Sequence, residues 1–477
     1  MSGVVAAGQG ATAAAALEVL SDGGNAVDAA IAACAASFLA EPMLASAGGG
    51  GLITVCLPGQ EPVVVDCFSD VPGSSGHQPD VLDFRAEVID FGTVTQEFHI
   101  GRGSAAVPGM LQGFAEAHRL FGTRDLGYLM APATRLAREG VTVTPETAHV
   151  FGLLWPLLRG SAETVDLYGG RLPVVGDVLV NPALAATLED FARTGDVPAR
   201  FSDGLLERFG PEHGGLISED DLRAYKAEAR PALVVELNDW RAYTSPLVGG
   251  ELVGVIAGEL AKGDLCANEA DEMVRYARAS GAGHDKRFAL ITPGSTTHIS
   301  VIDRHGGAVA VTLTNGEGCG ELIPGTGVQL NNFLGEEDLN PHGFHKHTPG
   351  QRLPTMMAPT VGTRAGSAAL ALGSGGSNRI RTAVGQVLYR VAGLGWAIED
   401  AVLAPRVHAE GDVVWVELET VNDPAKALEA LNREFGTVHP FPRRDFFFGG
   451  VHAVFIDEHG ELHGVGDSRR GGTSSLV

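Results

Sequence analysis

Apolar residues near the N-terminus predict two helices built largely from alanine. Alanine and leucine dominate residues 11–20, and a second apolar stretch covers residues 29–40. Residues 22–24 end the first stretch, and Asn25 followed three residues later by Asp28 is typical of a capped helix start. The second stretch is shorter than a membrane span, and no basic segment precedes it. We therefore expect a buried helix there, and no signal peptide.

The stretch from residue 104 to residue 240 is expected to be mainly helical. Apolar residues recur at spacings of three and four from Leu111 to Phe121 and from Leu126 to Arg138, which is the period of a helix with one buried face. Ser218 followed by three acidic residues predicts another helix start, because a serine cap and early acidic side chains both stabilise the first turn.

The pattern changes sharply before residue 296. Residues 262–295 are polar with few large apolar side chains, and they predict a mobile linker. Apolar and polar residues then alternate from Thr297 to Asp303 and from Ala308 to Thr314, with a turn between them. Alternation on both sides of a short turn predicts a β-hairpin whose first strand starts where the linker ends.

Thr296 lies at this junction of linker and strand. A threonine hydroxyl is a weak nucleophile unless a base lies beside it. If the chain is cut before Thr296, the new α-amino group, with a pKa of about 7.7–8.0, becomes that base. The same hydroxyl can make the cut by attacking the carbonyl of Ser295, after which water hydrolyses the ester. The pattern alone is more typical of an ordinary strand start, because threonine favours strands.

The composition of the chain limits the classes of molecule that it can bind. Its 477 residues favour two or three domains, unless two halves share one large sheet. With 34 Lys and Arg against 58 Asp and Glu, the formal net charge is −24. Such a charge opposes binding to nucleic acid and to anionic membranes, while a small-molecule substrate is compatible with it.

The cysteines and histidines do not indicate a metal site. Five scattered cysteines without a CxxC pair favour reduced thiols, so we expect a cytoplasmic protein. His342, His345 and His347 fit no standard metal spacing, because Lys346 lies between two of them. We expect a solvated, pH-sensitive loop there and no metal or other cofactor.

Motifs along nearly the whole chain resemble the γ-glutamyltranspeptidase family. In chain order they are Gly23-Gly24-Asn25-Ala26-Val27-Asp28-Ala29-Ala30, Val107-Pro108-Gly109, residues 131–137, Gly214-Gly215-Leu216, Asp220-Asp221-Leu222, Thr296-Thr297-His298, residues 324–327, Leu330-Asn331-Asn332, Gly375-Gly376-Ser377, Ala404-Pro405-Arg406 and Asp467-Ser468-Arg469. One such match is weak, but this many collinear matches make chance agreement implausible.

The resemblance implies an α+β fold of four αββα layers, as in N-terminal-nucleophile hydrolases. It implies self-cleavage into fragments 1–295 and 296–477, which share one core and stay together as a heterodimer. It also implies that Thr314 hydrogen-bonds the nucleophile, and that the backbone N–H groups of Gly375 and Gly376 form an oxyanion hole. Glycine suits that role because it lets the backbone approach a substrate closely.

The chain departs from the family pattern in the substrate pocket. The family arginine that grips the glutamyl α-carboxylate aligns with Phe68, and an aromatic ring cannot pair with a carboxylate. A family glutamine aligns with Phe333, and a family Ser-Ser pair aligns with Thr355 and Met356. We therefore expect a more apolar pocket, which would discriminate against free glutamyl groups.

The polar side of the same pocket is partly kept. The asparagine expected two residues beyond Thr314 is Gly316, while Asn315 and Asn332 remain candidate substrate-binding residues. Glu336 can stand in for the family aspartate that binds the glutamyl amine. The machinery of bond cleavage is thus retained while the recognition of γ-glutamyl groups is largely lost.

Three hypotheses follow. In the first, the protein is an amide hydrolase or acyltransferase acting on a non-γ-glutamyl acyl group. In the second, Thr296 breaks a carbon–carbon bond, as in actinobacterial homologues that make 4-alkylproline units of antibiotics, which this chain resembles in lacking a leader and the arginine. In the third, the chain is a relative that only binds or assembles.

Overall fold

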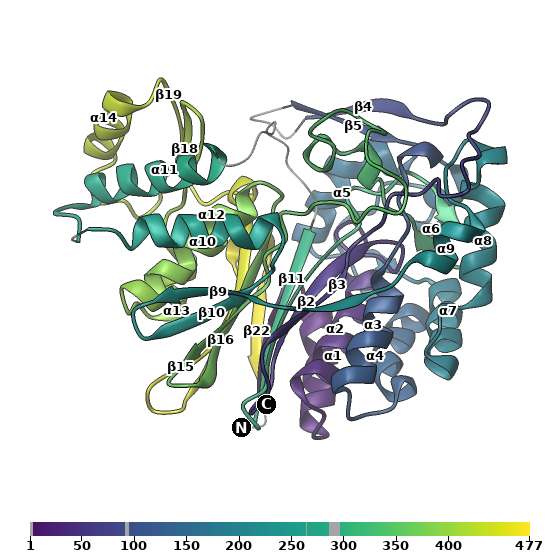
Figure 1. Ribbon diagram of the computed structural model, residues 1–477, viewed down its shortest axis with the longest axis horizontal. Coiled ribbons are helices and arrows are strands. Elements are labelled where there is room, and N and C mark those ends of the chain that lie inside the picture. Colours follow the sequence, from purple (N-terminus) through teal and green to yellow (C-terminus); the bar gives the residue numbers. More distant parts are fainter. Residues whose placement is uncertain (1–2, 91–94, 264, 286–295) are drawn as a thin grey trace.

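The computed structural model describes residues 3–90, 95–263, 265–285 and 296–477 (Figure 1). Two antiparallel sheets form its centre. The first has seven strands in the order β22 (Thr473–Leu476), β1 (Gly3–Ala7), β11 (Thr296–Asp303), β12 (Ala308–Thr314), β2 (Gly50–Cys56), β3 (Val63–Cys67) and β8 (Glu228–Pro231). The second has six, in the order β21 (Leu462–Val465), β20 (Gly450–Ile456), β16 (Ser367–Gly375), β15 (Thr360–Arg364), β10 (Trp240–Thr244) and β9 (Leu233–Leu237).

The two sheets face each other, and helices lie on their outer sides (Figure 1). Strands β11 and β12 pack against β16, and β11 also packs against β20. Small side chains such as Ala6, Ala310 and Ala371 fill the space between the sheets. The first sheet is covered by α1 (Gly10–Ser21), α2 (Ala26–Ala40) and α3 (Met110–Phe121), with α4 (Leu126–Glu139) on α2, and the second by α10 (Val248–Leu260), α12 (Arg379–Leu388) and α13 (Ile398–Leu403).

The remaining helices and small sheets lie around this centre. The helices are α5 (Pro145–Leu158), α6 (Ala162–Leu167), α7 (Pro182–Thr194), α8 (Ala199–Phe209), α9 (Glu219–Ala224), α11 (Glu269–Asp285) and α14 (Pro424–Glu434). The small sheets are β4 (Arg85–Asp90) with β5 (Thr95–Ile100), β6 (Val141–Thr142) with β7 (Val178–Leu179), β13 (Leu322–Ile323) with β14 (Val328–Gln329), and β17 (Val407–Glu410) with β18 (Val413–Glu417) and β19 (Thr437–Phe441). Within the described ranges, no helix is both long and apolar enough to span a bilayer.

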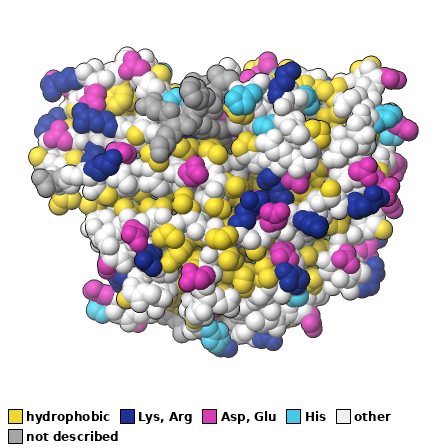
Figure 2. Space-filling view, in the orientation of Figure 1, with side chains coloured by type: hydrophobic (Ala, Val, Ile, Leu, Met, Phe, Trp, Pro, Cys, Tyr) yellow, Lys and Arg dark blue, Asp and Glu magenta, His cyan; other side chains and the backbone are white. Residues whose placement is uncertain are grey.

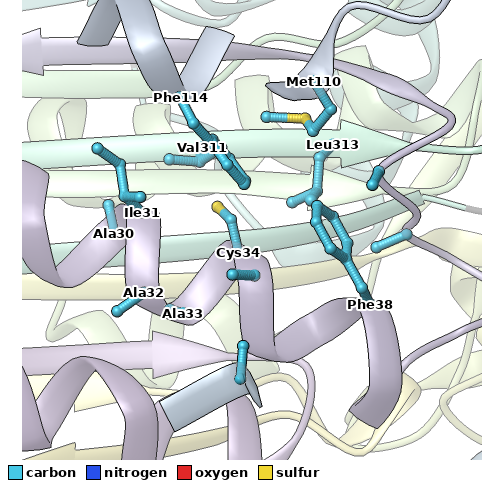
Figure 3. Close-up of a cluster of buried hydrophobic side chains, with 14 of the residues drawn as sticks. Ala30, Ile31, Ala32, Ala33, Cys34, Phe38, Met110, Phe114, Val311 and Leu313 are labelled. Carbon is cyan, nitrogen blue, oxygen red and sulfur yellow. The ribbon is translucent and has the colours of Figure 1, made fainter. Parts of the chain in front are cut away.

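Helix α2 is buried along its whole length, as the alanine-rich pattern predicts. Its small side chains let it pack closely against the strands, where Cys34 lies among Val311 and Phe114 (Figure 3). The rings of Phe38 and Phe114 stack at 5.8 Å between centroids. Asn25 and Asp28 form the predicted capping box at its start, which confirms that prediction.

The hairpin around residue 305 is confirmed, and so are the predicted helices within residues 111–138 and the helix start at Ser218. The prediction of a linker over residues 262–295 is wrong for residues 269–285, which form α11. This helix buries Met273, Val274 and Tyr276 against its neighbours. A few apolar side chains are therefore enough to hold it in place, although its overall composition is polar. Residues 286–295 lie outside the described residues.

Each of the two sheets contains strands from before and from after residue 296. In the first sheet, β11 lies between β1 and β12, and β12 lies between β11 and β2. In the second, β10 from the earlier part pairs with β15 from the later part. Neither part forms a complete sheet alone.

Acidic and basic side chains are interspersed on the face seen in Figure 2.

Candidate active site

Thr296 is the first residue of β11, and it lies directly opposite Thr314 in the register of the hairpin. Its side chain is buried, with 5% of the residue exposed. Because strand side chains alternate between faces, Thr296 shares a face with His298 and Ser300. Ser300 donates to the carbonyl of His452 in β20, so this face looks toward the second sheet. The structure thus brings Thr296 and Thr314 together at the space between the sheets.

His298 links the two strands behind Thr296. Its Nδ1 lies 2.8 Å from the hydroxyl of Thr312, and its Nε2 lies 2.9 Å from the hydroxyl of Ser300. Burial, together with the nearby His452, lowers the pKa of His298 well below its usual value. The neutral ring fits a place between two hydroxyls, each of which can donate or accept. His298 therefore ties the two strands of the hairpin together, and Ser300 links them to the facing sheet.

Gly375 brings the end of β16 against Thr296. A Cβ built on Gly375 would lie only 2.0 Å from the carbonyl oxygen of Thr296, so only glycine allows this approach. The hydroxyl of Ser374 donates to the carbonyl of Gly375 at 2.7 Å. The peptide bond between Gly375 and Gly376 is trans, so the N–H of Gly376 points in the direction opposite to the carbonyl of Gly375. This N–H therefore faces away from Ser374. Gly376 has φ +118°, a conformation that favours glycine.

The polar candidates lie beside Thr314. The N–H of Gly316 donates to the hydroxyl of Thr314 at 3.0 Å. A Cβ on Gly316 would lie 2.2 Å from Asn332 Oδ1 and 2.4 Å from Glu336 Oε1, so the glycine lets both side chains close on the backbone. Asn332 Oδ1 accepts from the N–H of Glu317 at 2.9 Å. The structure therefore places Asn332 and Glu336 against Gly316, whose N–H binds the hydroxyl of Thr314.

This polar cluster contains buried groups that are not satisfied within the described residues. Both side-chain amide atoms of Asn315 and the Oε1 of Glu336 have no hydrogen-bond partner there. Burial raises the pKa of Glu336 well above its usual value, and the charges of Glu317 and Asp338 raise it further. Buried polar atoms without partners are rare and indicate a place that a polar ligand can complete.

The aromatic candidates form a packed pair. The rings of Phe68 and Phe333 lie 4.8 Å apart, and the residues are 1% and 0% exposed. Met356 belongs to the same cluster of buried side chains. Thr355 is buried, and its hydroxyl accepts from the N–H of Met357 at 3.1 Å. The aromatic side chains therefore fill this region with apolar volume and offer no charge to a glutamyl carboxylate.

Sequence reasoning missed two charged residues near the site. Arg352 donates to Asp66 at 2.8 Å and to Asp70 at 2.5 Å, so the cation near Phe68 is held by two carboxylates. Glu41 accepts from the hydroxyl of Thr297 at 2.5 Å, and burial raises its pKa. Both residues are distant from their partners along the chain, and no local pattern marks either.

The histidine loop contacts backbone carbonyls. The Nε2 of His345 lies 2.9 Å from the carbonyl of Gly103, and that of His347 lies 2.8 Å from the carbonyl of Leu339. His342 is exposed. Among the residues the structure describes, no three His, Cys, Asp or Glu side chains are grouped so as to hold a metal ion. That the reaction needs no metal or cofactor stays a prediction.

Comparison with known proteins supplies the family. The model of the gamma-glutamyltranspeptidase family matches residues 12–276 and 265–477. The chain belongs to this family. Among curated relatives, the acylase ACY 1 proenzyme of Pseudomonas sp. (strain V22) is 30% identical over 531 aligned residues, covering 100% of this chain and 93% of the relative.

Two solved structures share the fold of this family member. The crystal structure of cephalosporin acylase from Bacillus halodurans has a TM-score of 0.83 at 23% identity, covering 99% of this chain and 95% of the acylase. The LmbA2991HD structure has a TM-score of 0.79 at 21% identity, covering 100% and 98%. At these identities the likeness concerns the fold and leaves the substrate undetermined.

Proposed function

We propose that this family member is a self-cleaving hydrolase or acyltransferase whose nucleophile is the hydroxyl of Thr296. The observation that carries the proposal is that Thr296 meets Thr314 across the hairpin and Gly375 from the facing sheet. The relation to ACY 1, an acylase named as a proenzyme, supports both the cleavage and the reaction type. The four-layer αββα architecture of N-terminal-nucleophile hydrolases is part of the same proposal, supported by two facing sheets with outer helices.

In the proposed self-cleavage, the hydroxyl oxygen of Thr296 attacks the carbonyl carbon of Ser295. The peptide C–N bond breaks as the C–O ester bond forms, and water then hydrolyses the ester. A carboxylate remains on Ser295 and a free amine on Thr296. The fragments 1–295 and 296–477 stay together as a heterodimer, because strands of one fragment pair with strands of the other in both sheets.

In the proposed turnover, the freed amine of Thr296 takes the hydroxyl proton as the oxygen adds to a substrate carbonyl. The N–H groups of Gly375 and Gly376 stabilise the oxyanion, since fixed backbone dipoles need no reorganisation during the reaction. Collapse of this intermediate expels the leaving group, which receives the proton. Water or an acceptor nucleophile then releases the acyl group from Thr296.

The proposed substrate is a small molecule with an acyl group other than γ-glutamyl. Phe68 and Phe333 occupy the region with apolar rings, and Arg352 is already held by Asp66 and Asp70. A glutamyl carboxylate would lose its water there without gaining an ion pair, which is costly. A γ-glutamyl anilide is therefore expected to be turned over poorly, and robust turnover would refute this part of the proposal.

A second reaction fits the same site, because Phe68 and Phe333 supply no group that would require an amide substrate. Thr296 could add to a ketone carbonyl and form the same oxyanion. The C–C bond then breaks only if conjugation stabilises the leaving carbanion. Incubation with a diene-type pyrroline acid should release a small diacid. No release by protein that has cleaved itself would count against this reaction.

Intact mass tests the nucleophile directly. Wild-type protein should give two fragments in place of one 49.5 kDa chain, and the smaller should begin with Thr296 by N-terminal sequencing. Thr296→Ala should stay uncut, while Thr296→Ser keeps a hydroxyl and should cleave. An uncut wild-type chain, identical in mass behaviour to Thr296→Ala, would refute self-cleavage and would favour a relative that only binds.

A further inference from the structure

A cavity of about 400 Å³ opens beside the candidate active site, next to the strand that follows the N-terminus. Its walls come from the segment after β1, the end of α2, the first turns of α5 and the segments around residues 445 and 470. Glu41 is one of its lining residues and is hydrogen-bonded to Thr297, the neighbour of Thr296. The cavity therefore lies beside the start of β11, on the face opposite to the side chain of Thr296.

Arg470 lines this cavity as a buried cation. Only 8% of the residue is exposed, and its guanidinium lies over the ring of Phe446 at 3.7 Å. Its Nη2 donates to the carbonyl of Phe446 at 3.3 Å, while Nε and Nη1 have no hydrogen-bond partner in the described part of the chain. None of the described carboxylates forms an ion pair with it.

The other arginines of the cavity wall are already paired. Arg469 donates to Glu417 at 2.8 Å and to Asp467 at 3.1 Å, and Arg444 donates to Glu419 at 3.2 Å. The carboxylates of the wall either accept hydrogen bonds or are exposed to solvent. Glu41 accepts from Thr12 and Thr297, Asp445 accepts from the N–H of Phe447, and Glu146 is exposed.

An unpaired buried cation is unfavourable, because it has lost its water without gaining a counter-charge. Burial and the like charges of Arg379 and Arg406 lower the pKa of Arg470 to about 9, and the opposite charges of Asp467 and Asp445 offset this only in part. An anion entering the cavity would supply the missing charge.

The guanidinium also lies against the glycine pair. Its Nη1 is 3.3 Å from the position of a Cβ on Gly375, and its Nη2 is 3.3 Å from that on Gly376. The same Gly375 approaches the carbonyl of Thr296. Arg470 therefore lies between the open cavity and the proposed oxyanion hole. Phe68 and Phe333, by contrast, are fully buried against each other.

We propose that this cavity binds a small carboxylic acid, with its carboxylate on Arg470 and its apolar body against Met43, Leu44, Val150 and Phe446. The assignment of this acid as the substrate rests on the proposed function of Thr296. In that reaction Arg470 supplies the carboxylate anchor that Phe68 cannot, from the other side of the nucleophile. Arg470 is then a specificity-determining residue.

Titration calorimetry on the purified, self-cleaved protein tests the site with phenylacetate as the probe. Wild-type protein should bind phenylacetate but not the neutral phenylacetamide. Arg470→Gln should weaken binding about tenfold or more, because a charge-assisted pair is lost, and Arg470→Lys should keep part of it. Arg444→Gln, which alters a paired arginine of the same wall, should change the affinity by less than about twofold.

A second variant guards against a folding defect at residue 470. Val150→Phe adds a ring to the apolar wall while leaving Arg470 intact, and it should also weaken phenylacetate binding. Undiminished affinity in both Arg470→Gln and Val150→Phe, or no binding to wild type, would overturn the proposal. Intact mass on the same samples separates the two claims. If the protein cleaves itself but does not bind phenylacetate, only the proposed binding site is refuted. If an uncut chain binds phenylacetate, only the proposed role of Thr296 as nucleophile is refuted.

Discussion

The contact between Gly375 and Thr296 predicts a large effect from a single methyl group. In Gly375→Ala the new Cβ would lie 2.0 Å from the carbonyl oxygen of Thr296 and 2.8 Å from its carbonyl carbon. Carbon–oxygen contacts normally settle at about 3.3–3.6 Å, so the two backbones must separate by more than about 1 Å. Strand β11 cannot yield easily, because Thr296 is paired with Thr314 in β12 and the strand is also paired with β1 from Ile299 onward.

Two magnitudes follow from this displacement. Overpacking of this kind costs about 1–3 kcal/mol of folding free energy, which a large domain can tolerate. A displacement of about 1 Å at reacting groups costs about 100-fold in rate. We therefore expect Gly375→Ala to fold with reduced stability and to cleave itself about 100-fold more slowly than wild type.

The assay is a time course of intact mass on freshly made precursor, with the free energy of unfolding measured in parallel. Gly281→Ala is the matched control, because a Cβ there meets open space within α11. It should cleave at the wild-type rate and gain up to about 1 kcal/mol, since alanine favours helix over glycine. A folded Gly375→Ala protein that cleaves as fast as wild type would refute the geometric reasoning.

Three further predictions concern packing, pH and thiols. Phe333→Ala should lower the free energy of unfolding by about 3–5 kcal/mol in guanidinium, whereas Val234→Ala at an exposed position should change it by less than about 0.5 kcal/mol. Because burial raises the pKa of Glu336, the folded state keeps a proton that the unfolded chain releases above pH 4.5, so stability should fall as pH rises beyond that value. Urea unfolding should show a smaller fall in Glu336→Gln, and equal slopes would contradict the assignment. Iodoacetamide should modify one thiol of the native protein, Cys266, because the other four cysteines are buried and burial raises the pKa of Cys67 to about 12. Rapid alkylation of a second thiol would contradict this.

Sequence patterns predicted correctly those elements that are determined by interactions between residues close together in the chain. The capping box at Asn25 and Asp28 and the alternation on both sides of the hairpin turn each act over a few residues, and the structure confirms both. Helix α11 shows where this fails. Ser280 bonds the backbone of Ala409, and Gly283 lets the side chain of Ile256 approach, so small residues that resemble a linker serve close packing.

The site shows the same division. A threonine at the start of a strand and a glycine pair at the end of another are visible in the sequence, and the structure brings Thr296 and Gly375 into contact. That Phe68 would meet Phe333, or that Arg470 would remain unpaired in a cavity, depends on segments far apart in the chain. No periodicity or spacing encodes such contacts, because they exist only after the sheets have assembled.

The positions of these residues explain how recognition can change while the chemistry is kept. Thr296 and Gly375 are each paired with a residue of a neighbouring strand, Thr314 and Gly450, so the sheets fix the position of their backbones. Phe68 follows the end of β3, and Arg470 lies in a short turn before β22. Side chains at such ends can be exchanged without disturbing a ladder of hydrogen bonds. In the proposed reaction, an anchor for a carboxylate can therefore move from one side of Thr296 to the other, while the scissile carbonyl still meets the proposed nucleophile and the proposed oxyanion N–H groups.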